Sequence, residues 1–261
     1  MLNKDMKVLL VAIFALLYVV GTAMSIYPVY GHASPMTYDP APNTVLNSPQ
    51  SLPDKVTITF TERPEIKASS IKILNSNNER IDSNDLTTGS DKTLSVSLDK
   101  SKITPGIYTV NWAVLSKDDG HITKGSYVFT IVDKDATPTQ NQQANSNINR
   151  STIFTKNQTT SDNIVLNFSI IPFKVGQNNF TLEVDHENGT AVENIRNVFF
   201  EFNNPEKNLG PIAETMEKIE AGIFSKSGSF ISQEGNWQIK VTVQRIGEYD
   251  INQTFDVPIK N

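Results

Sequence analysis

The chain has 261 residues, of which 38% are hydrophobic and 20% are charged, and it contains 13 glycines, 13 prolines and no cysteine. This composition excludes a collagen-like, a disulfide-stapled or a fully disordered protein, and the length admits one or two domains of ordinary size. The formal net charge is −5. Because the chain is mildly acidic and has no basic run, we expect it not to bind nucleic acid.

Residues 1–31 have the pattern of an export signal. Two lysines precede an uncharged apolar run at residues 8–20, and the segment ends with Gly31 in a context that suits signal peptidase. Cleavage there leaves His32 as the first residue and predicts an extracytoplasmic protein, either periplasmic, pseudoperiplasmic or at the cell surface. The alternative is an uncleaved membrane anchor, because residues 8–24 just reach the length that spans a bilayer.

Residues 32–134 carry the pattern of a β-domain. Apolar and polar side chains alternate from Val56 to Phe60, which is typical of a half-buried strand, and Thr104-Pro105-Gly106 is typical of a turn. Further strands are expected at residues 71–73, 94–98, 108–114 and 127–131. Five or more short strands without a helical period predict an antiparallel, immunoglobulin-like β-sandwich.

Residues 135–163 are rich in Asn, Gln, Thr and Ser and predict a flexible polar linker. A second alternating series occupies residues 164–261, and only residues 211–220 have a helical pattern. Strands are expected at residues 164–170, 180–184, 198–202, 237–243 and 255–259. The predicted fold is therefore all-β, with two sandwich domains. Six Asn-x-Ser/Thr sequons fit an exported protein, and the sequence leaves open whether they carry glycans.

The chain has only three histidines, at positions 32, 121 and 186. The α-amine and imidazole of an N-terminal His32 form a bidentate nitrogen chelate for a divalent metal. Asp119-Gly120-His121 can add a third nitrogen and an oxygen, and this donor set favours Cu(II). The alternative is that residues 117–120 form an ordinary polar hairpin turn. His186 lies between two acidic residues before a turn, which is typical of a solvated histidine.

The segments around these histidines resemble the CopC family of copper-binding proteins in order and spacing. The resemblance covers residues 32 to about 132, and it is carried by residues 32–35, 39–43, 52–62, 106–112, 116–121 and 125–129. It implies a Cu(II) site formed by the amino terminus and side chain of His32, by His121 and by Asp119, with Glu62 as a weaker candidate ligand. Asp118 is an extra acid beside the motif, so the sequence leaves open which acid faces the metal.

Two further expectations come from the same resemblance. Some family members carry a methionine-rich loop that binds Cu(I), but the only methionines after the signal here are Met36 and Met216, so we expect no Cu(I) site. We expect Met216 to pack in a core. The indole that corresponds to Trp112 lies near the metal in the family, whereas on pattern alone Trp112 is an ordinary core residue.

The second domain resembles the YtkA-like β-sandwich, on residues 172–176, 178–180, 185–189, 221–224 and 235–239, and has no catalytic motif. The sequence thus predicts a monomeric, non-enzymatic copper carrier for copper homeostasis or resistance, or for delivery to a cuproenzyme or membrane transporter. The resemblance implies a separate membrane partner of the CopD type. Two alternatives remain open: a copper-dependent polysaccharide monooxygenase, which also uses an N-terminal histidine, and a surface protein without a metal role.

Overall fold

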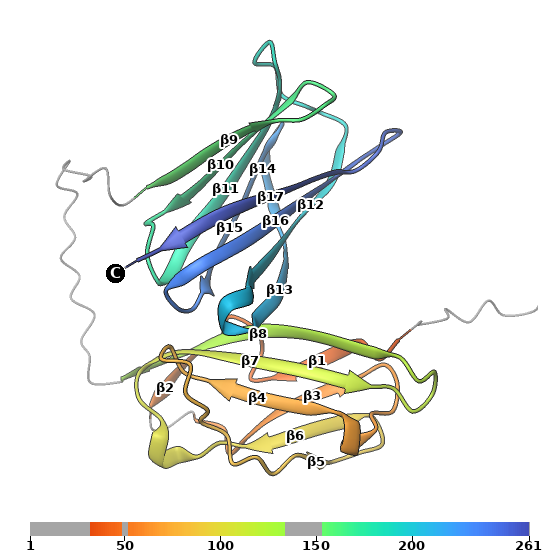
Figure 1. The fold of residues 1–261 in the computed structure, drawn as a ribbon, viewed down its shortest axis with the longest axis vertical. Coiled ribbons are helices and arrows are strands. Elements are labelled where there is room, and N and C mark those ends of the chain that lie inside the picture. The colour runs from red at the N-terminus through yellow and green to blue at the C-terminus, as the bar shows by residue number, and fades with distance from the viewer. Residues whose placement is uncertain (1–31, 49–51, 134–152, 261) are drawn as a thin grey trace, which may run out of the picture. The chain divides into compact units, whose positions relative to one another are not determined.

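The predicted β-strands are present in a computed structural model that describes residues 32–48, 52–133 and 153–260 (Figure 1). The predicted export signal at residues 1–31 lies outside the described residues. Within the described ranges the chain forms β-strands and short 3₁₀ helices, which confirms the all-β prediction. No helix in these ranges is long and apolar enough to cross a membrane.

Residues 32–133 form two four-stranded sheets, with the strand orders β1-β3-β6-β5 and β2-β8-β7-β4. The strands are β1 (Pro35–Asp39), β2 (Val45–Ser48), β3 (Lys55–Phe60), β4 (Ser70–Leu74), β5 (Thr87–Thr88), β6 (Thr93–Ser97), β7 (Gly106–Leu115) and β8 (Ile122–Asp133), and the 3₁₀ helices are η1 (Ile66–Ala68) and η2 (Lys100–Lys102). The predicted strands correspond to β3, β4, β6, β7 and β8. The remaining strands carry no alternation of buried and exposed side chains, because β1 and β5 contain no buried residue and β2 has only four residues.

The apolar side chains that alternate along these strands fill the space between the two sheets. Val56, Ile58 and Phe60 of β3 are fully buried, as are Val110 and Val114 of β7. They belong to one cluster that takes side chains from both sheets, and each contributes ~1.5–3 kcal/mol when fully buried. The strand pairs within residues 32–133 are antiparallel as predicted, except that β2 pairs with β8 in parallel.

The second sandwich has a five-stranded sheet, β14-β15-β11-β10-β9, and a four-stranded sheet, β13-β12-β16-β17. Its elements are β9 (Phe154–Thr159), β10 (Ile164–Ile171), β11 (Gly176–His186), β12 (Ile195–Asn204), η4 (Pro205–Lys207), β13 (Leu209–Thr215), β14 (Glu217–Glu220), β15 (Ile223–Ile231), β16 (Gly235–Arg245) and β17 (Ile251–Ile259). Trp237 is fully buried in its core, and its Nε1–H donates a hydrogen bond to the carbonyl of Gln233 at 2.9 Å. This bond satisfies the polar atom of a large apolar side chain.

Two expectations for this part of the chain differ from the structure. Strand β9 lies inside the predicted linker and was not predicted. Five of its six side chains are exposed, so this edge strand carries no apolar alternation. The prediction of a helical segment at residues 211–220 is wrong, since these residues belong mainly to β13 and β14. Ile212 and Met216 are both buried and lie four residues apart, which imitates a helix. The spacing arises instead because β13 ends at Thr215 and the chain changes strand there.

Candidate metal centre

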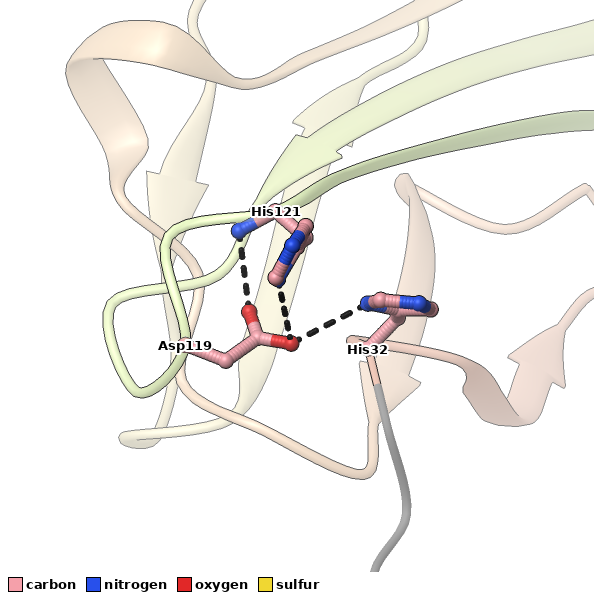
Figure 2. A group of neighbouring side chains, drawn as sticks. All are labelled: His32, Asp119 and His121. Atoms are coloured by element: carbon pink, nitrogen blue, oxygen red, sulfur yellow. Dashed lines mark hydrogen bonds and ion pairs between the residues drawn. The ribbon is translucent and has the colours of Figure 1, made fainter.

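Figure 2 shows three side chains from two distant segments that converge on one point. His32 precedes β1, while Asp119 and His121 lie in the loop between β7 and β8. The Nδ1 atoms of His32 and of His121 each lie 3.1 Å from Oδ2 of Asp119. One candidate ligand atom from each residue lies within 4.8 Å of the other two. Ligands that share one metal at bonds of ~2 Å are separated by roughly 3–4 Å, so a small movement suffices for all three to hold one ion.

The group is open to solvent, which an exchangeable ion requires. The side chains of His32 and His121 are 49% and 63% exposed, and that of Asp119 is 26% exposed. The two imidazole rings meet edge to face, with their centroids 4.6 Å apart. The carboxylate therefore lies between two rings that both remain accessible from outside.

Hydrogen bonds within the β7–β8 loop fix the positions of Asp119 and His121. The N–H of Ser116 donates to the carbonyl of His121 at 2.9 Å, and the N–H of Gly120 donates back to the carbonyl of Ser116 at 3.1 Å. The N–H of His121 donates to Oδ1 of Asp119 at 2.9 Å, which leaves Oδ2 directed at the imidazoles. Gly120 has a φ of +75°, a conformation that favours glycine.

Threonine hydroxyls hold the other side of the group. The hydroxyl of Thr123 donates to the carbonyl of Ala33 at 2.5 Å, and that of Thr61 donates to the carbonyl of His32 at 3.2 Å. The N–H of Ser34 donates to Oγ1 of Thr61 at 2.9 Å, and Ala33 is fully buried. His32 thus begins a short backbone segment, residues 32–34, that Thr61 and Thr123 anchor to the sandwich.

The structure distinguishes the two neighbouring acids. Asp118 faces Arg63, whose Nη2 and Nε lie 2.6 and 2.7 Å from Oδ1, and whose backbone N–H donates to Oδ2 at 2.8 Å. Asp119 faces the histidines instead. The N–H of His121, supported by Ser116 and by the two imidazoles, lowers the pKa of Asp119 to about 2. Asp119 is therefore a permanent anion at neutral pH, next to nitrogen donors.

Glu62, the fourth candidate from the sequence, does not join this group. Its Oε2 accepts a hydrogen bond of 2.6 Å from the hydroxyl of Ser116, and the group that can share an ion consists of His32, Asp119 and His121. The hydroxyls of Ser116, Thr61 and Thr123 have no role that the sequence predicts. Ser116 and Thr61 belong to segments that carry the family resemblance, which is the one signal that pointed to them.

The remaining candidates occupy separate places in the fold. Trp112 is 9% exposed and packs edge to face on Phe60, with the ring centroids 5.6 Å apart, so the expectation of a core residue is confirmed. Met216 is 5% exposed in the core of the second sandwich, as predicted, while Met36 is 62% exposed. His186 is exposed at the end of β11.

Comparisons with known proteins point to one family. The family described as CopC domain matches residues 36–132. Protein YobA of Escherichia coli strain K12 is 34% identical over 117 residues, which cover 44% of this chain and 90% of YobA, and YobA of Shigella flexneri gives the same values. Among solved structures, CopC from Methylosinus trichosporium OB3b is 25% identical with a TM-score of 0.36, over 41% of this chain and 99% of that protein. PcoC, a methionine-rich copper resistance protein from Escherichia coli, is 20% identical with a TM-score of 0.32, over 39% and 99% of the two chains.

Proposed function

This chain belongs to the CopC family, and from that premise we propose that it is an exported, non-enzymatic protein that holds one Cu(II) ion. The observation that carries the proposal is the convergence of two imidazole nitrogens on one carboxylate oxygen, each at 3.1 Å. Two or three nitrogen donors with one carboxylate suit Cu(II), which also heads the affinity order of the divalent ions for such ligands.

The orientation of His32 supports a chelate with its own amine. The α-amine and Nδ1 of one histidine close a six-membered ring around a metal, whereas Nε2 lies on the far side of the ring and cannot. Nδ1 is the nitrogen of His32 that faces Asp119. Cleavage after Gly31 therefore supplies a third nitrogen donor where His32 already meets Asp119 and His121. Both the amine and the imidazoles bind metal in their unprotonated forms.

The same arrangement favours a carrier over an oxidase. Oxygen activation by copper needs a free coordination position for oxygen, and the carboxylate of Asp119 lies between the imidazoles, where it competes for that position. The exposure of all three side chains suits the capture and release of an ion. We place the protein outside the cytoplasmic membrane, where it holds copper as a monomer and passes it to a separate membrane transporter of the CopD type or to a secreted cuproenzyme.

The decisive experiment is a Cu(II) titration of the secreted protein, followed by electron paramagnetic resonance, after mass spectrometry has established the first residue. We expect one tetragonal site with mainly nitrogen ligands. The site is lost in His32→Ala, and it is lost or altered when one residue is added before His32. His186→Ala is the matched control, because this exposed histidine belongs to the second sandwich. We expect it to leave the titration unchanged.

Two results contradict the proposal. If a chain that begins at His32 binds no stoichiometric Cu(II), the protein is a surface protein without a copper role. If the copper-loaded protein produces hydrogen peroxide with ascorbate and oxidises chitin or cellulose, the protein is an enzyme and the carrier proposal is wrong.

A further inference from the structure

Five of the six Asn-x-Ser/Thr sequons lie in the described part of the chain, all of them in the second sandwich, while the sixth, at Asn149, lies outside it. We propose that Asn188 of the sequon Asn188-Gly189-Thr190 is an N-glycosylation acceptor, and that the turn around it favours it over the other described sequons. This inference goes beyond copper binding. It rests on one part of the proposed function, the export of the protein.

The sequon occupies a tight turn directly after β11. The N–H of Gly189 donates to the carbonyl of His186 at 2.8 Å, and the N–H of His186 donates to the carbonyl of Thr190, also at 2.8 Å. Residues 186–190 are all exposed, and a Cβ atom added at Gly189 would meet nothing within 4 Å. The turn therefore has room for a bulky sugar, and it can enter the active site of a modifying enzyme without unfolding.

Thr190 orients the side-chain amide of Asn188. Its N–H and its hydroxyl both donate to Oδ1 of Asn188, at 3.0 and 2.7 Å. Nδ2, at the other end of the planar amide, has no hydrogen-bond partner among the described residues, although an amide nitrogen can donate twice. Two donors on Oδ1 also draw electron density toward the oxygen, which makes the Nδ2–H group more acidic. The nitrogen that has to react is thus free, oriented and easier to deprotonate.

The glycosyl transfer balances with a lipid-linked oligosaccharide as the donor. Nδ2 of Asn188 attacks the anomeric carbon of the sugar, so that a C–N bond forms and the C–O bond to the lipid phosphate breaks. The lipid phosphate leaves with the electron pair, and the amide proton passes to a base of the transferase. No oxidant or reductant is required. The donor and the transferase act outside the cytoplasmic membrane, where we place this protein.

The other described sequons lie on strands, with their asparagines at positions 157, 167, 179 and 252. In the sequon of Asn179 the amide is already engaged, because its Nδ2 donates to the hydroxyl of Thr181 at 3.3 Å and its Oδ1 accepts from two serine hydroxyls. Asn167 is half-buried, and its strand is paired with β9 on one side and β11 on the other. To bring such a strand into an enzyme, its hydrogen bonds to the neighbouring strands must break. The exposed turn at Asn188 requires no such change.

The test is mass spectrometry of the full-length protein isolated from the cells that naturally produce it. Trypsin leaves Asn179 and Asn188 together on residues 175–196, so a glutamate-specific protease that cuts at Glu183 and Glu193 is used to separate them. We expect the peptide of residues 184–193 to carry one oligosaccharide, and fragment ions to place it on Asn188.

Four variants produced in the same cells identify the cause. Asn188→Gln removes the acceptor and Thr190→Val removes the hydroxyl, and we expect each to lower the intact mass by one oligosaccharide. Thr190→Ser keeps the hydroxyl and should keep the oligosaccharide. Asn167→Gln is the matched control, because we expect it to change the mass only by the substitution itself. Substitutions in an exposed turn have little effect on stability, so we expect the melting temperature and the Cu(II) titration of Asn188→Gln to stay those of the wild-type protein.

Distinct results overturn the two proposals. An unmodified peptide of residues 184–193, from a chain that begins at His32, refutes glycosylation while copper binding stands. An oligosaccharide on Asn167 as frequent as on Asn188, or its retention in Thr190→Val, refutes the turn as the cause. If the chain begins at His32 and carries the oligosaccharide but binds no Cu(II), the copper proposal alone fails. If the chain keeps residues 1–31 and stays inside the cell, export is refuted and both proposals fail.

Discussion

Gly125 and Trp112 face each other across strands β7 and β8, and their contact allows a quantitative test of packing in the first sandwich. A Cβ atom added to Gly125 would lie 2.6 Å from Cζ2 of Trp112, 3.0 Å from Cε2 and 3.3 Å from Nε1. Optimal separations between carbon atoms are ~3.5–4.0 Å. The indole is a rigid ring, 9% exposed and packed against Phe60, so it has little freedom to move away.

We expect Gly125→Ala to lower the free energy of unfolding by ~1–3 kcal/mol, the range for extra atoms forced into a packed core. For a domain of ~100 residues each kcal/mol corresponds to ~4–8 °C in melting temperature, which calorimetry of the full chain resolves. Gly89→Ala is the control, because its nearest neighbour is Cγ2 of Thr93 at 3.9 Å. It measures the opposite, stabilising effect of a less flexible unfolded chain, ~0.4–1 kcal/mol.

A double-mutant cycle identifies the cause. Trp112→Phe removes the outer ring that contains Cζ2, so Gly125→Ala should cost less in that background by at least ~0.5 kcal/mol, the smallest coupling typical of residues in contact. The reasoning is refuted if Gly125→Ala is no more destabilising than Gly89→Ala. It is also refuted if the cost is the same whether residue 112 is tryptophan or phenylalanine.

Asp119, Thr123 and Arg63 give three further predictions. Because the pKa of Asp119 is lowered to about 2, this carboxylate carries no proton to lose between pH 5 and 7 and competes with protons only near pH 2. Asp119→Asn should therefore weaken Cu(II) binding at every pH in that range, and affinity equal to that of the wild-type protein at any of these pH values would contradict this. Thr123→Val removes the hydroxyl bound to the carbonyl of Ala33, and we expect a ~10-fold loss of Cu(II) affinity in competition titrations; equal affinity would show that the anchor is dispensable. Arg63→Ala breaks an exposed ion pair and should change the free energy of unfolding, measured in urea, by less than ~1 kcal/mol. A larger change would mean that Arg63 holds the loop by itself.

The sequence predicted the strands that bury alternate side chains and missed those that do not. In β3 every second side chain is buried, and the pattern is visible without a structure. In β9 only Phe154 is partly buried, so the sequence of this edge strand is as polar as that of a linker and does not predict a strand. The false helix at residues 211–220 arose from the same limit. A strand ending at Thr215 and another beginning at Glu217 placed two buried residues at helical spacing.

The candidate site was predictable to a different extent. Histidine is rare in this chain, so the positions of His32 and His121 were informative, and the spacing of Asp119 and His121 within one loop suggested a shared ligand. The choice between Asp118 and Asp119 was not predictable. It depends on Arg63, which lies 55 residues away in sequence but only 2.6 Å from Asp118 in the structure.

The hydroxyl groups around the site show why supporting residues are harder to predict than ligands. A metal restricts its ligands to a few residue types, so a histidine at an expected chain terminus already suggests a metal ligand. The residues that hold the ligands need only one donor or acceptor in the right place, and serine and threonine supply these throughout a β-sandwich. Thr61 and Thr123 differ from the other threonines only because their partners are the carbonyls of His32 and Ala33. These bonds matter because ordering one backbone residue costs ~1–2 kcal/mol. If His32 is the first residue of the mature protein, as we propose, its backbone is already fixed before copper binds and does not incur that cost, which is why we expect substitutions behind the site to change affinity.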